Sequence, residues 1–405
     1  MMKIHSNSRG RFLLACLCTL TLLVQTGCWS KDEIEDLGLY VGIALDVASK
    51  TEIEKKMDKL STSNRKKDLI TYTLQIIDKQ SEGKDGESSG VVTAKPYINV
   101  SETGDSLFEM VRGFSARMER PVIGHHLKVI VINEMLSRKY SMNNLLSFML
   151  RDNNIRPNSL IVMSSGMARD VFESKGTNII PSFRVIEMIG NRYRTLKIIP
   201  PMSLIAVEGK MHAKSSYLLQ NIVAAEGEIE FSGAAVIKGK TQKFKGLLSE
   251  EELLGIMWLT GEGKGGLVKS YDPETKQVIA YEIKTLKSKI ISQVKNGKIS
   301  FHVNIESDGR LIEEWLIDNV PLDHKFVTKA VHSSEKEVSR LVNRALHKIQ
   351  KEYMTDVMGF GTKLSISHPK VWQKVKEDWD EEFSRIPITY SIKLAITDTG
   401  AKRKH

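Results

Sequence analysis

The sequence predicts an α+β protein in which several subdomains have mixed or antiparallel sheets with helices packed on them. Three observations lead to this fold class. Strand-like and helix-like periodicities alternate through the first half of the chain. Long alternating strands and a β-hairpin signal follow in the second half. A long amphipathic helix and a further strand come after them.

In the first half, two strands are predicted from alternating residues. Large apolar residues occupy every second position of 39–45, interleaved with Gly42 and Ala44, which suits a strand buried on both faces. Residues 70–76 alternate apolar side chains with Thr71, Thr73 and Gln75, which predicts a strand with one solvent-exposed face. Further along, the periodicity predicts helices over 102–118, 143–150 and 168–172, and strands over 127–132 and 159–163.

The second half begins with a strand over 229–237, a turn and a second strand that ends near residue 247. Ser249 is expected to cap a helix over 250–259. Asn296-Gly297 predicts the tip of a type I′ hairpin. The longest helix of this half is expected over 333–353, followed by one helix that carries Trp372 and Trp379 on the same face. A strand over 388–396 completes a sheet expected to be antiparallel.

These elements predict four parts. Residues 1–27 form a signal peptide, 28–205 an N-terminal α/β domain, 206–227 a bridging segment and 228–401 a C-terminal α+β domain. The bridge is placed where periodicity is weak. Two polar stretches, 49–68 and 79–90, are expected to be mobile surface loops.

The signal peptide is recognised from its charge and length. Lys3, Arg9 and Arg11 precede an apolar run over 12–24. At about 1.5 Å per residue this run is shorter than the roughly 20 residues that a membrane-spanning helix needs. A short apolar run behind basic residues and before small ones is typical of a secretory signal.

Residues 25–28 (Gln-Thr-Gly-Cys) resemble a bacterial lipobox, in which the cysteine is lipidated and the chain is cut before it. Lipidation is therefore expected at Cys28. Gln25 departs from the pattern, since leucine is commonest there. The alternative is an ordinary secretory signal with an incidental cysteine.

Composition narrows the possible chemistry. Cys16 and Cys18 leave with the signal peptide, so the mature chain retains only Cys28. A single cysteine excludes disulfides within the chain, and thiol catalysis and cysteine metal sites are excluded once it is lipidated. The net charge of +10 falls to +7, because the removed segment has three basic and no acidic residues. Such a surface is compatible with an anionic membrane, but a well-solvated Lys-rich surface is favoured as the explanation for most of the charge. An exported chain is not expected to bind nucleic acid, although a basic charge alone permits it.

Three fragments resemble functional sites. Gly261, Gly263 and Gly266 match GxGxxG, but the loop follows a helix, so a helix cap is favoured over a phosphate site. His125-His126 are adjacent on an expected strand and point to opposite faces, which argues against a metal site. An acidic cluster is interpreted as the solvent face of a helix, with a hard-cation site as the alternative; its members are Asp378, Asp380, Glu381 and Glu382. No catalytic residue, metal ligand or cofactor is predicted.

An ordered set of short motifs nevertheless resembles the Ger(x)C family, the lipoprotein C subunits of nutrient germinant receptors of endospore-forming bacteria. Each motif is modest alone, and together they extend over the mature chain. They are GCW at 27–29, EIEDL at 33–37, VGIALD at 41–46, HLKVIV at 126–131, LRD at 150–152, WLTG at 258–261, GG at 265–266, KEY at 351–353, DVMGFG at 356–361, Pro369, Trp372 and DWD at 378–380.

This resemblance implies a non-enzymatic α+β lipoprotein on the outer face of the spore inner membrane. It also implies two partners, the polytopic membrane A and B subunits, and a role in triggering germination. The Lys-rich stretch 49–68 is longer than the loop expected in the family, and its role is left open. Two other classes remain: a lipid-anchored solute-binding protein that captures the nutrient itself, and a cell-wall enzyme.

Overall fold

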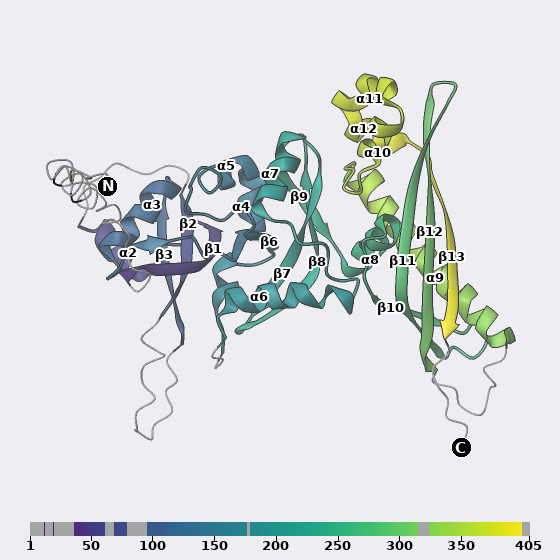
Figure 1. Cartoon of the computed structure of the whole chain (residues 1–405), viewed down its shortest axis with the longest axis horizontal. Helices are drawn as coiled ribbons and strands as arrows, with labels where there is room; N and C mark the ends of the chain where they lie inside the picture. The colour runs from purple at the N-terminus through teal and green to yellow at the C-terminus, as the bar shows by residue number, and fades with distance from the viewer. Residues whose placement is uncertain are drawn as a thin grey trace, which may run out of the picture.

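The computed structural model describes residues 36–60, 69–78, 95–175, 179–314 and 324–398, with the single positions 12 and 19. Two sheets, one of nine strands and one of four, are covered by helices (Figure 1). The predicted α+β class is therefore confirmed.

The nine-stranded sheet is mixed. Its order is β3-β2-β1-β5-β6-β7-β8-β9, with β4 beside β1. The central β1, β5, β6 and β7 are parallel, and the strands at both ends are antiparallel. The strands are β1 (Gly38–Val47), β2 (Ile70–Ile77), β3 (Tyr97–Gly104), β4 (Val122–Ile123), β5 (Val129–Asn133), β6 (Leu160–Ser164), β7 (Tyr217–Ala225), β8 (Glu228–Lys238) and β9 (Lys243–Leu248).

Helices cover both faces of this sheet, because strands in its centre are apolar on both sides. One face packs against α6 and the 3₁₀ helix Ala168–Phe172. The other packs against α3, α4, α5 and α7. These helices are α3 (Leu107–Gly113), α4 (Glu134–Lys139), α5 (Met142–Leu146), α6 (Pro181–Gly190) and α7 (Leu204–His212).

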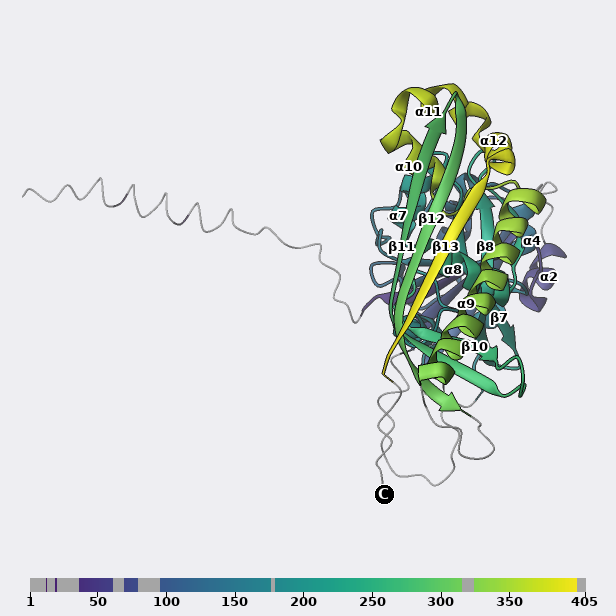
Figure 2. The ribbon, with the colours of Figure 1, turned by 90° about the vertical axis from the view of Figure 1, so that its right-hand side faces the viewer.

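The four-stranded sheet has the order β10-β11-β12-β13 (Figure 2). Its core is shared with helices α8, α9, α10 and α12 and with residues of β8. The elements are α8 (Glu250–Thr260), β10 (Gly266–Tyr271), β11 (Val278–Lys295), β12 (Lys298–Glu314), α9 (His324–His347), α10 (Phe360–Ser367), α11 (Pro369–Val375), α12 (Trp379–Arg385) and β13 (Ile388–Asp398).

Several local predictions in this half are confirmed. Ser249 caps α8 in a capping box with Glu252. Asn296 (φ 51°) and Gly297 (φ 76°) form the tip between β11 and β12. A type I′ turn requires positive φ at both of these positions. Helix α9 has 24 residues, begins earlier than expected and continues into a π-helical turn, Lys348–Glu352.

The second sheet is mixed rather than antiparallel. β13 pairs with β12 in parallel, with Phe301 opposite Ile388. The connection between the two strands explains the parallel pairing. Helices α9 to α12 follow β12 and bring the chain back to the end of the sheet where β12 starts, so β13 runs in the same direction as β12. Alternating residues define a strand but carry no information on its direction.

The predicted bridge over 206–227 differs from what the structure shows. This segment contains the end of α7 and strand β7, which pairs with both β6 and β8. The proposed boundary at residue 228 lies at the turn between β7 and β8, and the first sheet continues to Leu248. Weak periodicity here reflects a short helix followed by a sheet strand, which no single period describes.

The prediction that one face of β2 is exposed to solvent is wrong. Thr71, Thr73 and Gln75 are buried, because β1 and β3 flank β2 and α6 lies over this face. Their polar atoms are paired within the protein. The bonds join Thr71 Oγ1 to Thr103 Oγ1 (2.9 Å), Thr73 Oγ1 to Ser101 Oγ (2.7 Å) and Ser182 Oγ, as donor, to Gln75 Oε1 (2.6 Å).

Two segments contain elements that periodicity did not predict. The expected helix over 102–118 is the end of β3 followed by α3 and a 3₁₀ turn. The expected loop over 49–68 contains α2 (Glu52–Asp58), which begins at a capping box of Thr51 and Glu54. The Glu54 carboxylate also accepts the N–H of Thr103 on β3. Helix α2 therefore covers part of an edge strand.

Asp46, at the end of β1, is fully buried. Its carboxylate accepts the backbone N–H groups of Ala168 (2.6 Å) and Arg169 (3.0 Å), at the start of the 3₁₀ helix. Burial raises the pKa of Asp46 to about 6, and these two hydrogen bonds oppose that rise. The carboxylate thus ties the sheet to the helix that covers it.

The hairpin tip gives one prediction. Gly297→Ala forces a side chain into φ 76° although no atom lies near the added carbon. It should lower the free energy of unfolding by about 1–2 kcal/mol. Urea denaturation measures this. Gly190→Ala is the matched control, because Gly190 also has open space but φ −56°; equal losses in both variants would contradict the strain argument.

Asp46 gives a second prediction. Between about pH 4 and pH 6 the folded chain holds a proton that the unfolded chain has lost, so the stability of the wild type falls with rising pH. The fall should approach about 3 kcal/mol relative to Asp46→Asn, which has no charge to bury. Urea unfolding of both proteins across this range measures the difference. If the unfolding free energies of the two proteins change in parallel with pH, burial does not raise the pKa of Asp46.

Candidate functional site

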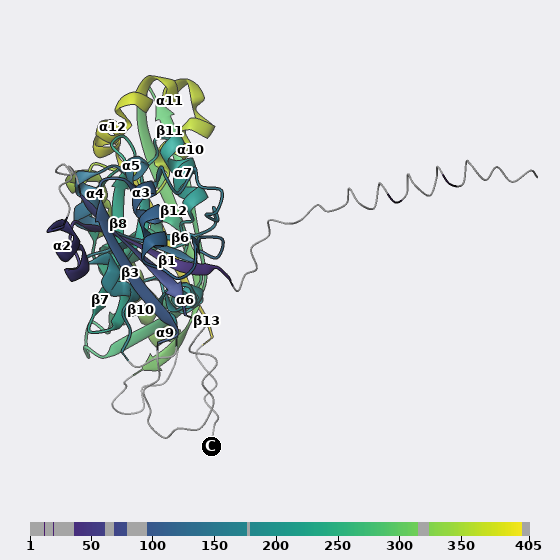
Figure 3. The same cartoon turned by 90° about the vertical axis from the view of Figure 1, so that its left-hand side faces the viewer.

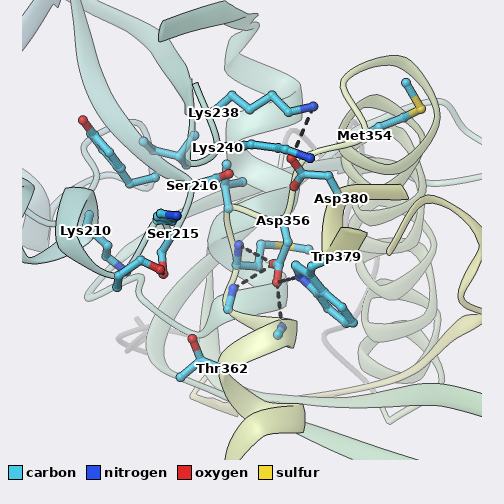
Figure 4. A pocket seen from close by; sticks show the side chains of 18 of the residues that line it. Lys210, Ser215, Ser216, Lys238, Lys240, Met354, Asp356, Thr362, Trp379 and Asp380 are labelled. Carbon is cyan, nitrogen blue, oxygen red and sulfur yellow. Dashed lines mark hydrogen bonds and ion pairs between the residues drawn. The ribbon is translucent and has the colours of Figure 1, made fainter. Parts of the chain in front are cut away.

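A cleft of about 1250 Å³ lies between the two halves of the chain (Figure 4). One wall comes from α7, β7 and the turn between β8 and β9. The other comes from α10, α11 and α12, and α8 contributes to the floor. Motif residues of the DVMGFG and DWD segments line the second wall, so sequence motifs and a concave surface coincide here.

Asp356 organises this second wall. Its carboxylate accepts the backbone N–H groups of Met358 (3.1 Å), Gly359 (2.9 Å), Phe360 (3.2 Å) and Gly361 (2.7 Å). These groups begin α10, so a negative charge there is also favoured by the helix dipole. The Asp356 carboxylate thus has a structural role, and its oxygens already accept hydrogen bonds from the protein.

Asp356 also binds a tryptophan of the next helices. The indole Nε1–H of Trp379 donates to its Oδ2 at 3.0 Å (Figure 4). This contact requires a glycine at 361, since an added carbon would lie 2.7 Å from Trp379 Nε1 and 3.1 Å from the Trp372 ring. The Asp356, Gly361 and Trp379 motif positions therefore belong to one packing unit.

The prediction that Trp372 and Trp379 share one helix is wrong. They lie on α11 and α12, with the 3₁₀ turn Lys376–Asp378 between them. Their rings still meet edge to face, with centroids 5.2 Å apart. Trp379 also lies edge to face against Phe301 of β12, with ring centroids 6.4 Å apart, so Trp379 anchors its helix to the sheet as expected, and Trp372 packs on Trp379. Both rings are partly buried.

Charges of opposite sign face each other across the cleft. Lys238 of β8 pairs with Asp380 at 3.2 Å (Figure 4). Lys240 reaches Asp378 at 4.0 Å. Glu381 pairs with Arg385 on its own helix. Three of the four residues in the acidic cluster thus have basic partners in the described structure, which favours the surface interpretation over a cation site.

A second hollow of about 1030 Å³ lies in the N-terminal half, beside β1, α3 and α5. Arg151 and Asp152 of the LRD motif line it, together with Tyr40. Burial and the nearby Asp152 charge raise the pKa of the Tyr40 phenol, which therefore stays neutral. The LRD motif thus contributes two side chains to a concave surface of the described residues.

The remaining candidate motifs have structural roles. Gly261 ends α8 with φ 70°, and the loop with Gly263 and Gly266 leads into β10, which supports the helix-cap interpretation. His125 and His126 lie in a turn between β4 and β5 rather than on a strand, and His125 bonds Asn154 at 3.0 Å. Within the described ranges no three His, Cys, Asp or Glu residues are grouped as a metal site requires.

The signal peptide and Cys28 lie outside the described residues, so lipidation there stays a prediction. No helix in the described part of the chain is both long and apolar enough to span a membrane.

Sequence reasoning missed the cleft because its walls come from segments far apart in the chain. It also missed the role of Asp356, although a signal was present. Aspartate side chains commonly accept the backbone N–H two residues ahead in an Asx turn, and Asp356 does so with Met358.

Family models match both halves of the chain. Residues 30–223 match the spore germination protein N-terminal domain, and residues 232–400 match the C-terminal domain described as spore germination B3/GerAC like. The two matches leave residues 224–231 between them, and the first sheet extends beyond this gap to Leu248.

The chain belongs to this spore germination family. It is similar to spore germination protein YndF of Bacillus subtilis (strain 168), with 43% identity over 96% of both chains. Spore germination protein B3 of the same organism is 30% identical over 97% of both chains. The crystal structure of the GerBC protein matches with a TM-score of 0.59 and 25% identity, over 83% of this chain and all of that one. These relatives support a role in germination.

Asp356 gives a third prediction. Asp356→Ala removes the acceptor of five N–H groups and should cost at least about 3 kcal/mol of unfolding free energy. Near-UV circular dichroism should also change, because Trp379 loses its partner. Asp378→Ala, an exposed acid on the same wall, should cost less than about 1 kcal/mol. If both variants unfold at the same urea concentration, Asp356 does not organise the wall.

Proposed function

We propose that the chain is a lipid-anchored, non-enzymatic subunit of a nutrient germinant receptor. Its lipid is attached at Cys28, and its place is the outer face of the spore inner membrane. Its partners are the polytopic A and B subunits. The observation that carries this proposal is similarity over nearly the whole chain to spore germination proteins B3 and A3, at 30% and 26% identity.

The cleft supports a binding role over a catalytic one. Asp356 binds backbone N–H groups and Trp379 through its carboxylate, and Asp380 faces Lys238. Carboxylates engaged in this way hold walls in place and are poor general bases, because their lone pairs already accept hydrogen bonds from the protein.

Lipid attachment agrees with the energetics of anchoring. A buried acyl chain contributes about 0.8 kcal/mol per methylene, and one chain binds a bilayer only marginally. A diacylglyceryl group supplies two chains. Stable attachment through Cys28 then requires no spanning helix.

A second candidate is a lipid-anchored protein that captures the nutrient directly. The cleft of about 1250 Å³ and the hollow of about 1030 Å³ favour it. The reason is that small-molecule sites are concave. Nutrient-dependent thermal stabilisation of the isolated chain would support capture. Co-purification with the two membrane subunits supports the receptor subunit.

Replacing the anchor cysteine tests the proposal. Cys28→Ala should abolish diacylglyceryl transfer and the cleavage that depends on it, leaving a released or unprocessed chain. Mass spectrometry of the N-terminus and co-purification with the membrane subunits are the measurements. Cys16→Ala and Cys18→Ala are controls, because both cysteines are expected to leave with the signal peptide. An unmodified thiol at Cys28 in the wild type would overturn lipid anchoring, and failure to co-purify would overturn complex membership.

A further inference from the structure

Helix α2 exposes an apolar stripe. Ile53, Met57 and Leu60 are 50%, 59% and 87% exposed. Ile53 and Met57 lie one turn apart on the same face of α2, and Leu60 lies in the turn that follows the helix, where its N–H donates to the Met57 carbonyl. A helix of a soluble protein normally turns such a face toward the core, yet α2 buries none of its residues. The stripe is therefore an unpartnered face within the described structure.

The orientation of α2 is set by its other side. The Glu54 carboxylate accepts the N–H of Thr103 on the edge strand β3, and Asp58 forms an ion pair with Lys50. Glu54 and Asp58 lie one turn apart on the face away from the stripe. These contacts direct Ile53, Met57 and Leu60 outward.

Lysines flank the stripe. Lys56 and Lys59 are exposed and form no ion pair with any described residue, whereas Lys55 pairs with Glu52 at 2.6 Å. The segment 49–68 has seven basic and four acidic residues, a net charge of +3. Apolar residues on one helix face with lysines beside them are typical of helices that lie in the interface of an anionic bilayer.

The position of α2 agrees with such a contact. Figure 1 places α2 and β1 at the end of the molecule away from the four-stranded sheet, and Figure 3, viewed from that end, shows α2 at its margin. Cys28 precedes Gly38 of β1 by ten residues. Such a segment spans at most about 35 Å when fully extended. If Cys28 carries the lipid, as proposed above, the start of β1 stays within about 35 Å of the bilayer. Helix α2 follows the other end of this ten-residue strand, about 33 Å away along its axis.

We propose that α2 is a membrane-contact helix of the chain. Ile53, Met57 and Leu60 insert among the lipids of an anionic bilayer, and Lys56 and Lys59 bind its headgroups. The contact gives the tethered protein one orientation toward the membrane, and it provides a function for residues 52–60 of the Lys-rich stretch.

Vesicle flotation tests this without the lipid anchor. The chain from residue 28 with Cys28→Ser, which keeps every described element from β1 onward, should float with phosphatidylcholine vesicles that contain phosphatidylglycerol. Binding should weaken with added salt. Ile53→Ser/Met57→Ser/Leu60→Ser should reduce partitioning about tenfold or more, because three apolar side chains leave the bilayer. Lys56→Glu/Lys59→Glu should reduce binding to these vesicles as well.

The matched control is Leu267→Ser/Ile312→Ser/Ile366→Ser. These side chains are similarly exposed, at 49%, 51% and 73%, but lie on the C-terminal elements. Unchanged flotation of this control, with melting temperatures like the wild type for every variant, completes the expected result.

Three outcomes would overturn the proposal: no flotation of the parent chain at low salt, equal loss in the control, or flotation that survives the α2 substitutions. If those substitutions instead weaken co-purification with membrane subunits while flotation persists, the stripe binds a protein. Because the tested chain carries no lipid, none of these results decides whether Cys28 is acylated.

Discussion

Helix α8 sets the main constraint on this molecule. Seven of its eleven residues are buried, and Trp258 is completely enclosed. A helix that is apolar on all sides is stable only when it is surrounded. The first sheet supplies one side through β8, and β11, β12 and α9 supply the others. Gly255 allows the close approach of α9, since an added carbon would lie 2.2 Å from the Leu341 carbonyl oxygen. The two sheets are joined around this helix rather than by a linker.

The cleft depends on the same packing. Helix α9 packs against α8, and the π-helical turn after α9 leads to Asp356. The Asp356 carboxylate accepts the N–H of Gly361 in the first turn of α10 and the indole N–H of Trp379. The family motifs that line the cleft are explained by this requirement. Asp356 satisfies N–H groups, Gly361 makes room for an indole, and Trp379 closes the unit. The residues available for binding are therefore those on the surface of the cleft, where Lys238 pairs with Asp380.

Much of the fold could be predicted from the sequence. Strand β1, helix α8 with its Ser249 cap, the turn at Asn296-Gly297 and the long helix α9 were each indicated by local patterns. Local patterns succeed where one residue type is required by a backbone conformation or one period persists for many residues. They failed for β2, where Thr71, Thr73 and Gln75 suggested water but face partners inside the protein. Alternation shows which residues share a face, and it does not show what covers that face.

The sequence by itself determined the family and the α+β class, because these depend on short ordered motifs and on composition. It also predicts an export signal and lipidation at Cys28. Only the tertiary structure decided the parallel pairing of β13, the inclusion of 206–227 in the first sheet, and the placing of Trp372 and Trp379 on separate helices. It also decided that α2 attaches through Glu54 to the edge of β3 and leaves Ile53, Met57 and Leu60 exposed. The physical reason is common to all of these. Strand direction, burial and side-chain partners are set by residues distant in the chain, and no local period records them.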